Sequence, residues 1–349
     1  MITDLRLQNF RSYKDESLEI SPGVNIIVGP NASGKTNLLE SILVMARGSS
    51  YRAKDSELVR FDQPWARIDA HTLRGSRTVK IKVEELGGKS FEIDDKVYKK
   101  LSINTSLPVV LFEPNHLLLL AGGPERRRTY LDDLIKQTTP GYSTVLAQYR
   151  RALAQRNSLL KQQGSGGQMF AWDIRLSQLA GQIVKARTEL VSEISKQIEG
   201  LYKELSSADN EVGIEYLGQW PADVYETKML KKLETSLDID RMRGYTTTGP
   251  HREDFEITFD GHPASEVASR GETRTTVLAL KIIELKTLEE VRGVKPLLLL
   301  DDVFSELDGK RRHKLTDYLA PYQTFITTTD ADLVLQHFTE TTHIIPLTT

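Results

Sequence analysis

The sequence predicts an α/β fold in which a buried parallel sheet is combined with an antiparallel β meander and a long helical insertion. Three patterns in the 349 residues predict it. Short apolar runs at Val24–Val28 and Leu297–Leu300 are typical of buried parallel strands. Apolar and polar residues alternate between residues 66 and 93, which indicates antiparallel strands, whereas helical periodicity dominates from residue 125 to about residue 205.

The first of these strands leads into a glycine-rich loop that fits the phosphate-binding pattern G-x-x-x-x-G-K-[ST], and a helical pattern follows it. Free backbone N–H groups and the dipole at such a helix start favour an anion. We expect Lys35 to reach the β- and γ-phosphates of ATP and the Thr36 hydroxyl to ligate Mg²⁺. A glycine-rich surface turn is the alternative. The expected nucleotide-binding residues of the loop are Gly29, Pro30, Asn31, Ala32, Ser33, Gly34, Lys35 and Thr36.

Composition limits the possible partners and compartments. The net charge is −2, so a nucleic-acid partner would need a local basic patch. The chain has no cysteine, which excludes disulfides, thiol nucleophiles and cysteine metal sites and fits a reducing compartment. The N-terminus has no apolar signal-peptide core, and no apolar run is long enough to span a bilayer. We therefore expect a cytoplasmic protein without a membrane partner.

Around the loop, two further strands are predicted at Ile2–Phe10 and Glu16–Ile20. Arg11 directly follows the first of them, near where phosphates would lie; it is a candidate nucleotide contact or an ordinary exposed turn arginine. The helix from Thr36 should end near Gly48. Beyond it the meander is expected to lie beside the nucleotide, with its hairpin turn at Gly87-Gly88, and the next strand covers residues 107–112.

The insertion contains two helices with an apolar seam. The first has seam residues at alternating four- and three-residue steps from Tyr142 to Leu160, except that Arg156 occupies one seam position. The second keeps a heptad seam from Trp172 and continues to Leu205 after a four-residue stutter. A Gly/Ser turn at residues 164–167 separates them. This predicts a short antiparallel coiled-coil hairpin that projects as an arm, or alternatively a helical subdomain packed on the core.

These patterns predict two domains. A discontinuous ATPase head should comprise residues 1–120 and 245–349, and the helical arm domain should comprise residues 121–244. Towards the end of the insertion, a strand is expected at Val212–Tyr216 and a helix from about Asp223 to Arg243. The chain should then form a strand at residues 255–259, a long helix from Ser269, and final strands at 324–329 and 343–347.

The apolar strand at Leu297–Leu300 is followed by two carboxylates, Asp301 and Asp302. Beside a phosphate-binding loop, we expect Asp301 to hold the hydrated Mg²⁺ that Thr36 also ligates. Asp302 lies where a carboxylate could orient the attacking water, and because aspartate is shorter than glutamate, slow turnover is expected. The alternative is a helix cap after a buried strand.

A second anion-binding end is predicted where Ser269-Arg270-Gly271-Glu272 opens a long helix. The Ser269 hydroxyl and the Gly271 N–H would both point at an anion. Because one P-loop already serves the phosphates of one ATP, this end is best explained if it caps the γ-phosphate held by another subunit. The pattern therefore predicts an ATP-dependent homodimer with two sandwiched nucleotides. The alternative is a serine that only caps its own helix.

The order of these motifs resembles the ABC-type ATPase heads of chromosome-maintenance and DNA-repair proteins, and more narrowly the RecF family of bacterial recombination mediators. The resemblance implies binding of single- and double-stranded DNA and weak, DNA-stimulated ATP hydrolysis. It also implies work with RecR and RecO to load RecA at gapped DNA, in replication, repair and the SOS response. Besides the P-loop and the Ser269 segment, the motifs that carry it are residues 9–13, 123–128, 249–254 and 301–308.

The sequence departs from that family in mild ways. The family commonly has Gln where Glu272 stands and Asp where Glu253 stands. At the position by the 324–329 strand where transporter ATPases place a histidine, this sequence has none; Thr327 and Thr328 stand there instead. A transporter ATPase subunit is therefore the weaker alternative, as is an ATP-dependent nuclease, which would need a carboxylate cluster beyond the ATP site.

The DNA-contacting residues are not marked clearly by the sequence. No aromatic-interleaved basic patch indicates a base-stacking surface, so salt-sensitive contacts to the DNA backbone are expected rather than sequence-specific readout. A helical charge run is most often a solvated face. The candidate cations are Arg126, Arg127, Arg128, Arg150, Arg151, Arg156, Lys161 and Lys185.

Overall fold

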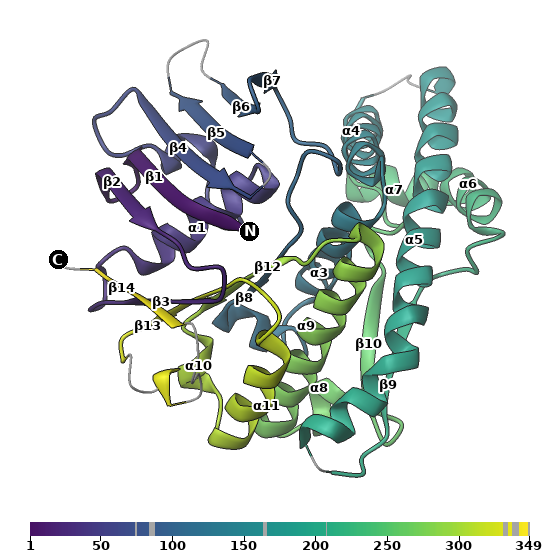
Figure 1. Cartoon of the computed structure of the whole chain (residues 1–349). Helices are drawn as coiled ribbons and strands as arrows, with labels where there is room; N and C mark the ends of the chain where they lie inside the picture. The colour runs from purple at the N-terminus through teal and green to yellow at the C-terminus, as the bar shows by residue number, and fades with distance from the viewer. Residues whose placement is uncertain are drawn as a thin grey trace. The chain divides into compact units, whose positions relative to one another are not determined.

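The computed structural model describes residues 1–73, 75–83, 88–162, 166–206, 208–330, 334–336 and 342–347. Within them the chain forms two compact units, one made of Met1–Leu117 with Glu284–Thr349 and the other of Leu118–Ile283 (Figure 1). The predicted α/β class is confirmed, since a parallel sheet, an antiparallel sheet and a helical insertion are all present.

The first unit contains a five-stranded sheet in which every neighbouring pair is parallel. Its central strands are fully buried, as their unbroken apolar sequences predict. All of these strands end at the same edge, which is where the glycine-rich loop and the Asp301 carboxylate lie. The strand order is β14 (Thr342–Pro346), β3 (Val24–Val28), β13 (Thr324–Thr328), β12 (Leu297–Asp301) and β8 (Val109–Phe112).

A six-stranded antiparallel sheet completes the core of this unit. The hairpin between β5 and β6 is present, although Gly87 of its predicted turn lies outside the described residues. The strand order is β2 (Tyr13–Glu19), β1 (Ile2–Phe10), β4 (Trp65–Thr72), β5 (Gly75–Lys82), β6 (Lys89–Ile93) and β7 (Lys96–Tyr98).

Helix α1 (Lys35–Arg47) packs against both sheets and carries nine consecutive buried residues, from Leu38 to Ala46. It ends at Gly48, whose φ of 82° is the left-handed conformation that glycine adopts without strain. Because α1 is buried against both sheets, the loop at its N-terminus is fixed to the hydrophobic core. The remaining helices of this unit are α2 (Asp55–Leu58), the 3₁₀ helix η1 (Pro114–Leu118) at its boundary, α10 (Val303–Glu306) and α11 (Gly309–Leu319).

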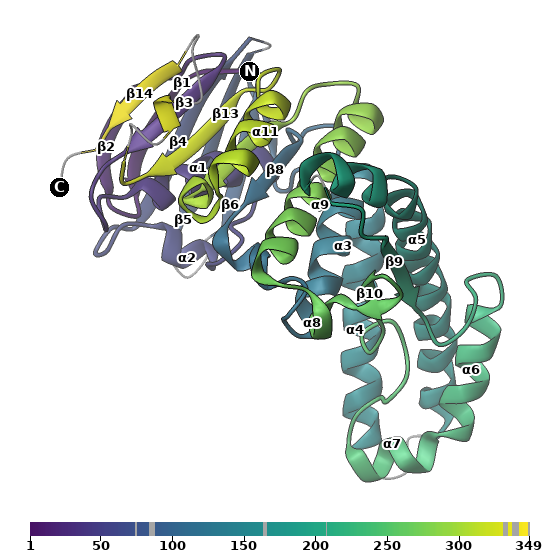
Figure 2. The same cartoon turned by 90° about the horizontal axis from the view of Figure 1, so that it is seen from below.

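The second unit is organised around α5 (Gly166–Ser206), a helix of 41 residues. Its apolar seam is buried by α4, α6 and β9 along different parts of its length (Figure 2). The predicted helical hairpin, α4 with α5, is therefore one part of a packed subdomain; its projection as an arm stays a prediction. The other elements are α3 (Pro124–Thr138), α4 (Tyr142–Leu160), β9 (Val212–Leu217), α6 (Tyr225–Thr235), α7 (Leu237–Arg243), β10 (Asp254–Phe259), β11 (His262–Pro263), α8 (Ala264–Val267) and the first part of α9 (Arg270–Arg292), whose last residues belong to the first unit.

Several local predictions need correction. The single helix expected from Asp223 to Arg243 is two helices, because the Ser236 hydroxyl donates to the Lys232 carbonyl at 2.7 Å and the chain turns there. Strand β2 begins at Tyr13 rather than Glu16, since Phe10 pairs with Tyr13 across a tight turn. The expected Gly/Ser break cannot be compared at Gly164 and Ser165, which lie outside the described residues.

The compact units and the predicted domains have different bounds. The second unit begins at Leu118, close to the predicted start at residue 121, but continues to Ile283 instead of ending at residue 244. The reason is the pairing of β10 with β9, together with the packing of α3 on β10, which ties residues 254–259 to the insertion. The functional division into an ATPase head and an arm stays a prediction.

Candidate nucleotide-binding site

The glycine-rich loop joins the end of β3 to the start of α1, which is the strand–loop–helix context that the motif requires. Gly34 has a φ of 98°, and a Cβ atom there would lie only 2.8 Å from the Ser12 hydroxyl oxygen, so both conformation and space demand glycine. The Lys35 ammonium donates to the carbonyls of Gly29 and Pro30, at 2.7 and 2.8 Å. The cation of the motif thus lies against the loop itself.

The predicted metal-binding residues meet at the same edge of the parallel sheet. The Thr36 hydroxyl donates to Asp301 Oδ1 at 3.0 Å. Asp301 is only 9% exposed and also accepts a hydrogen bond from Thr327, on the neighbouring strand β13, at 2.8 Å. A hydroxyl and a carboxylate at the mouth of a phosphate loop are the hard oxygen ligands that Mg²⁺ takes alongside phosphate oxygens and water. The residues present therefore fit Mg²⁺.

Asp302 differs from its neighbour in exposure and in conformation. It is exposed and has a φ of 53°, so its side chain leaves the strand direction that Asp301 keeps. The Ser305 hydroxyl donates to the Asp302 carbonyl at 2.7 Å and lies 3.2 Å from its carboxylate. The backbone N–H of Asp302 donates to the Thr327 hydroxyl at 2.9 Å. An exposed carboxylate next to a buried one is compatible with the predicted role in orienting water, which stays a prediction.

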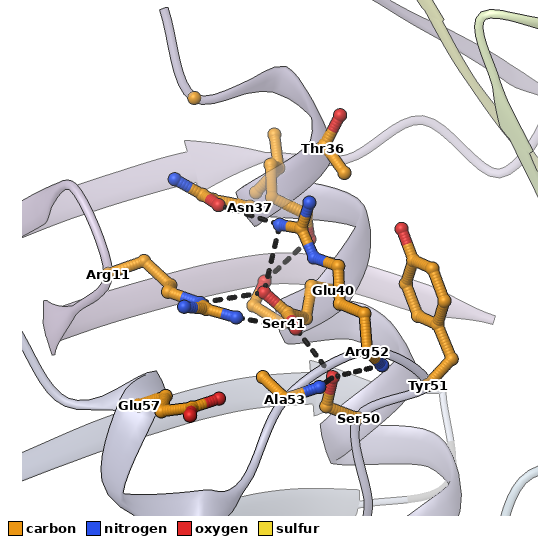
Figure 3. A network of polar contacts seen from close by, with 12 residues as sticks. Arg11, Thr36, Asn37, Glu40, Ser41, Ser50, Tyr51, Arg52, Ala53 and Glu57 are labelled. Carbon is orange, nitrogen blue, oxygen red and sulfur yellow. Dashed lines mark hydrogen bonds and ion pairs between the residues drawn. The ribbon is translucent and has the colours of Figure 1, made fainter. Parts of the chain in front are cut away.

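A buried carboxylate beneath the loop holds two arginines (Figure 3). Glu40 on α1 is fully buried. Its carboxylate accepts hydrogen bonds from Nε and Nη2 of Arg11, at 2.9 and 3.0 Å. It also accepts from Arg52 at 3.1 Å and from the Ser50 hydroxyl at 2.5 Å. Burial by itself would raise the pKa of Glu40, but these hydrogen bonds outweigh it and lower that pKa. Arg11 is thus a bound partner of Glu40 and not a free turn residue; its predicted contact with nucleotide stays a prediction.

Tyr51 and Arg52 are site residues that the sequence did not reveal. The Tyr51 hydroxyl lies 3.4 Å from Asp301 Oδ2, and burial followed by the Asp301 charge raises the pKa of Tyr51, so the phenol stays protonated. The Arg52 guanidinium lies 5.7 Å from the centre of the Tyr51 ring and donates to the Asn37 side chain at 2.9 Å. Both follow α1 in the chain, but only folding brings them to the loop, so periodicity carried no signal for them.

Ser269, the second predicted anion contact, caps its own helix. Its hydroxyl accepts the backbone N–H of Glu272 at 3.2 Å, while the Glu272 carboxylate accepts the backbone N–H of Ser269 at 2.7 Å. This reciprocal pair is a capping box, in which glutamate or glutamine serves equally. Ser269 is exposed, and Gly271 follows it in the first turn of α9. The capping alternative is therefore realised, and the contact with a partner's ATP stays a prediction.

The segment Gly249–Asp254 forms a buried polar network in the second unit. The Glu253 carboxylate, 3% exposed, accepts hydrogen bonds from Tyr216, Tyr225 and the backbone of Gln219, at 2.7 to 2.9 Å. His251 lies 2.7 Å from the Tyr149 hydroxyl, and burial lowers the pKa of His251 to about 4. A glutamate at this position is thus fully satisfied, and the network ties β10 to β9, α4 and α6.

The candidate DNA-binding cations fall into two groups. Arg156 is fully buried and bound to Asp173 and Asp240 at 2.6 and 2.7 Å, so it does not belong in the list. Arg127 is bound by Asp254, and Arg128 donates to the Glu253 carbonyl, which leaves both only partly exposed. The candidates that are exposed on the surface are Arg126, Arg150, Arg151, Lys161 and Lys185.

Two further findings concern alternative functions. Among the described residues, no group of three or more His, Cys, Asp or Glu side chains could hold a metal ion. In that same part of the chain, no helix is both long and apolar enough to cross a membrane.

The strand–loop–helix unit and the Thr36–Asp301 contact define a P-loop nucleotide-binding protein, and the two sheets around α1 give it the fold of an ABC-type ATPase head. The sequence matches the family described as "RecF/RecN/SMC N terminal domain" over residues 1–346. It is 33% identical to "DNA replication and repair protein RecF" of Acetivibrio thermocellus, over 95% of this chain and 94% of that protein. The protein of the same name from Halothermothrix orenii is 34% identical, over 94% and 92%.

Solved structures of RecF proteins also match this chain. A structure of the recombination mediator protein RecF-ATPrS in the RecFOR pathway matches with a TM-score of 0.89 and 32% identity, over 99% of this chain and 96% of that one. A RecF-ATP structure matches with a TM-score of 0.85 and 34% identity, over 94% and 92%. An Smc head domain, 15% identical with a TM-score of 0.54, shares the fold alone. The chain belongs to the RecF family of DNA replication and repair proteins.

Proposed function

We propose that this protein is an ATP-gated DNA-binding protein of recombinational repair and replication, in which slow ATP hydrolysis acts as a timer. The observation that carries the proposal is the 3.0 Å hydrogen bond between Thr36 and Asp301. It joins the phosphate loop to the acidic end of β12, as Mg²⁺-ATP binding requires. Slow hydrolysis is proposed because Asp302, rather than a longer glutamate, follows Asp301.

The proposal includes dimerisation around two ATP molecules. Lys35, Thr36 and Asp301 would hold the nucleotide and Mg²⁺ of one subunit, and Ser269 of the other subunit would complete the γ-phosphate contacts. The exposed hydroxyl of Ser269 at the start of α9 supports this, because its capping bond leaves lone-pair and donor capacity on the same oxygen. DNA, both single- and double-stranded, is the proposed ligand of the dimer, and RecR, RecO and RecA are the proposed partners.

Dimerisation is tested by analytical ultracentrifugation with ATP and Mg²⁺. The parent should dimerise, whereas Lys35→Ala, which loses the phosphate contact, and Ser269→Arg, which places a bulky cation at the proposed interface, should stay monomeric. The matched control is Glu272→Gln, which preserves the capping box and should dimerise like the parent. A Ser269→Arg protein that dimerised normally would remove Ser269 from the interface.

DNA binding is tested at two salt concentrations with ATP, with ADP and without nucleotide. We expect tight binding only with ATP, and weaker binding at the higher salt because phosphate contacts dominate. Binding that does not depend on the nucleotide would mean that the P-loop does not gate DNA.

A further inference from the structure

Tyr245 and Arg252 are seven residues apart, but their side chains meet on the surface of the second unit. The Arg252 guanidinium carbon lies 4.9 Å from the centre of the Tyr245 ring, a cation–π stack. Tyr245 is 40% exposed and Arg252 is also exposed. A planar cation and an aromatic ring are thus held together where solvent, or a ligand, can reach them.

The segment between the two residues is firmly anchored. The Thr246 hydroxyl and backbone N–H both donate to the Asn157 side chain, at 2.7 and 2.8 Å. The Thr247 hydroxyl donates to Asp240 at 2.6 Å, and His251 is bound to Tyr149 on α4. These hydrogen bonds fix the backbone directly after Tyr245 and directly before Arg252. Because the two side chains are already held in place, little of their conformational entropy is lost when a ligand stacks on them.

The surroundings of the pair are positively charged. Lys161, at the end of α4, lies close to Gly244, since a Cβ atom on that glycine would come within 3.6 Å of Lys161 Cε. Arg243, the last residue of α7, is exposed beside it. Within the described part of the chain, no hydrogen bond or ion pair links the side chains of Lys161, Arg243 or Arg252 to a carboxylate. These cations are available for an anionic ligand.

We propose that Tyr245 and Arg252 form a stacking site for a base of single-stranded nucleic acid, with Lys161 and Arg243 contacting the flanking phosphates. Unpaired bases present flat faces that stack on aromatic rings and on arginine planes, whereas a duplex hides those faces. An acidic peptide could satisfy the cations but has no flat group for the Tyr245–Arg252 stack. The inference rests on the proposed function and deepens it, because it gives the expected DNA binding a place and a chemistry.

The test measures binding of oligo-dT by fluorescence anisotropy, with ATP and Mg²⁺, over a range of salt concentrations. Tyr245→Leu, which removes the ring but no charge, should weaken binding by roughly 5- to 150-fold, the range expected for one base–aromatic stack. Its salt dependence should equal that of the parent, because no phosphate contact is lost. Lys161→Gln should instead make the slope of log affinity against log salt shallower by about 0.7, the value for one phosphate of a single strand.

Conservative variants separate stacking from folding and from charge. Tyr245→Phe keeps the ring and should bind like the parent, and Arg252→Lys keeps the charge but loses the plane, so it should bind more weakly than the parent. Lys196→Gln, an exposed cation on α5 that is not among the candidate DNA contacts, is the matched control and should change nothing. On an abasic strand of the same length, Tyr245→Leu and the parent should bind equally.

Two results would overturn the proposal. If Tyr245→Leu bound oligo-dT as tightly as the parent, or lost equal affinity for the abasic strand, no base stacks there. If Tyr245→Leu and Arg252→Lys bound DNA normally but no longer bound one of the proposed partners RecR, RecO or RecA, the surface would be a protein-docking site. ATP-dependent duplex binding by the parent, measured alongside, separates these failures from failure of the proposed function: a parent that bound no DNA with ATP would overturn both.

Discussion

The Thr327 hydroxyl donates a 2.8 Å hydrogen bond to Asp301 Oδ1 across the neighbouring parallel strands β13 and β12. The same hydroxyl accepts the backbone N–H of Asp302 at 2.9 Å. One fully buried side chain thus orients the carboxylate expected to bind Mg²⁺ and fixes the turn that exposes the next one. Thr327 is a positioning residue, because it acts on the site through Asp301 and Asp302.

Thr327→Val should therefore weaken the binding of Mg²⁺ that supports ATP binding. Valine keeps the shape but removes a hydrogen bond to a charged group, which costs about 1.5 kcal/mol at the lower end of the range for such bonds. The Mg²⁺ concentration for half-maximal ATP binding should then rise roughly tenfold. Fluorescent-nucleotide titrations at varied Mg²⁺ measure it. Thr327→Ser, which keeps the hydroxyl, should remain close to the parent; an unchanged Mg²⁺ requirement in Thr327→Val would contradict the positioning role.

Glu40→Gln should destabilise the fold. The substitution preserves size but removes the charge that binds Arg11 and Arg52, whose side chains are 22% and 36% exposed. Breaking a buried ion pair leaves the partner charges poorly compensated, so we expect a loss of about 2–3 kcal/mol in the free energy of unfolding, measured by urea denaturation.

The control for Glu40 is the exposed pair between Arg6 on β1 and Asp15 on the edge strand β2. Asp15→Asn breaks that pair in solvent and should leave the stability close to that of the parent. Equal losses in Glu40→Gln and Asp15→Asn would mean that burial adds nothing to the Glu40 cluster.

Arg156→Ala should lower the free energy of unfolding by about 3–5 kcal/mol, because it leaves the buried carboxylates of Asp173 and Asp240 without their shared cation. Arg151→Ala, an exposed arginine of the same helix, should be nearly neutral. Thermal and chemical denaturation compare the two. An Arg156→Ala protein with unchanged stability but weaker DNA binding would restore Arg156 as a DNA contact.

Stability should fall in mild acid because of His251. Its pKa is lowered to about 4 in the folded state from an ordinary value of 6.5. Between these values the unfolded chain binds a proton that the folded chain does not, so stability is fully present above about pH 6.5 and decreases as the pH falls towards 4. At pH 5 the expected loss is about 2 kcal/mol relative to neutral pH.

The measurement is urea denaturation at neutral pH and near pH 5, for the parent and for His251→Gln. The variant cannot take up this proton, so its stability should depend less on pH by about that amount. A variant with the same acid sensitivity as the parent would assign the effect to other groups.

Much of the nucleotide site was predictable because its signals are local. The residues from Gly29 to Thr36 carry their own strand and helix context, and Leu297–Asp302 carries its burial and its carboxylates within six residues. Parallel strands end at one edge of a sheet, so the meeting of Thr36 and Asp301, 265 residues apart, followed from two separate local patterns. The heptad seams likewise predicted α4 and α5.

The partners of individual charged and polar groups, in contrast, depend on how the elements pack together. The sequence predicts a surface cation at Arg156, which interrupts an apolar seam, but Asp173 and Asp240 from other helices neutralise it inside the unit. Arg11 reaches Glu40, Ser269 caps its own helix, and Tyr245 meets Arg252. Hydrophobic periodicity follows from the geometry of one helix or strand, so the sequence of that element is enough to predict it. Ion pairs and stacks depend on which elements pack together, so only the folded chain determines them.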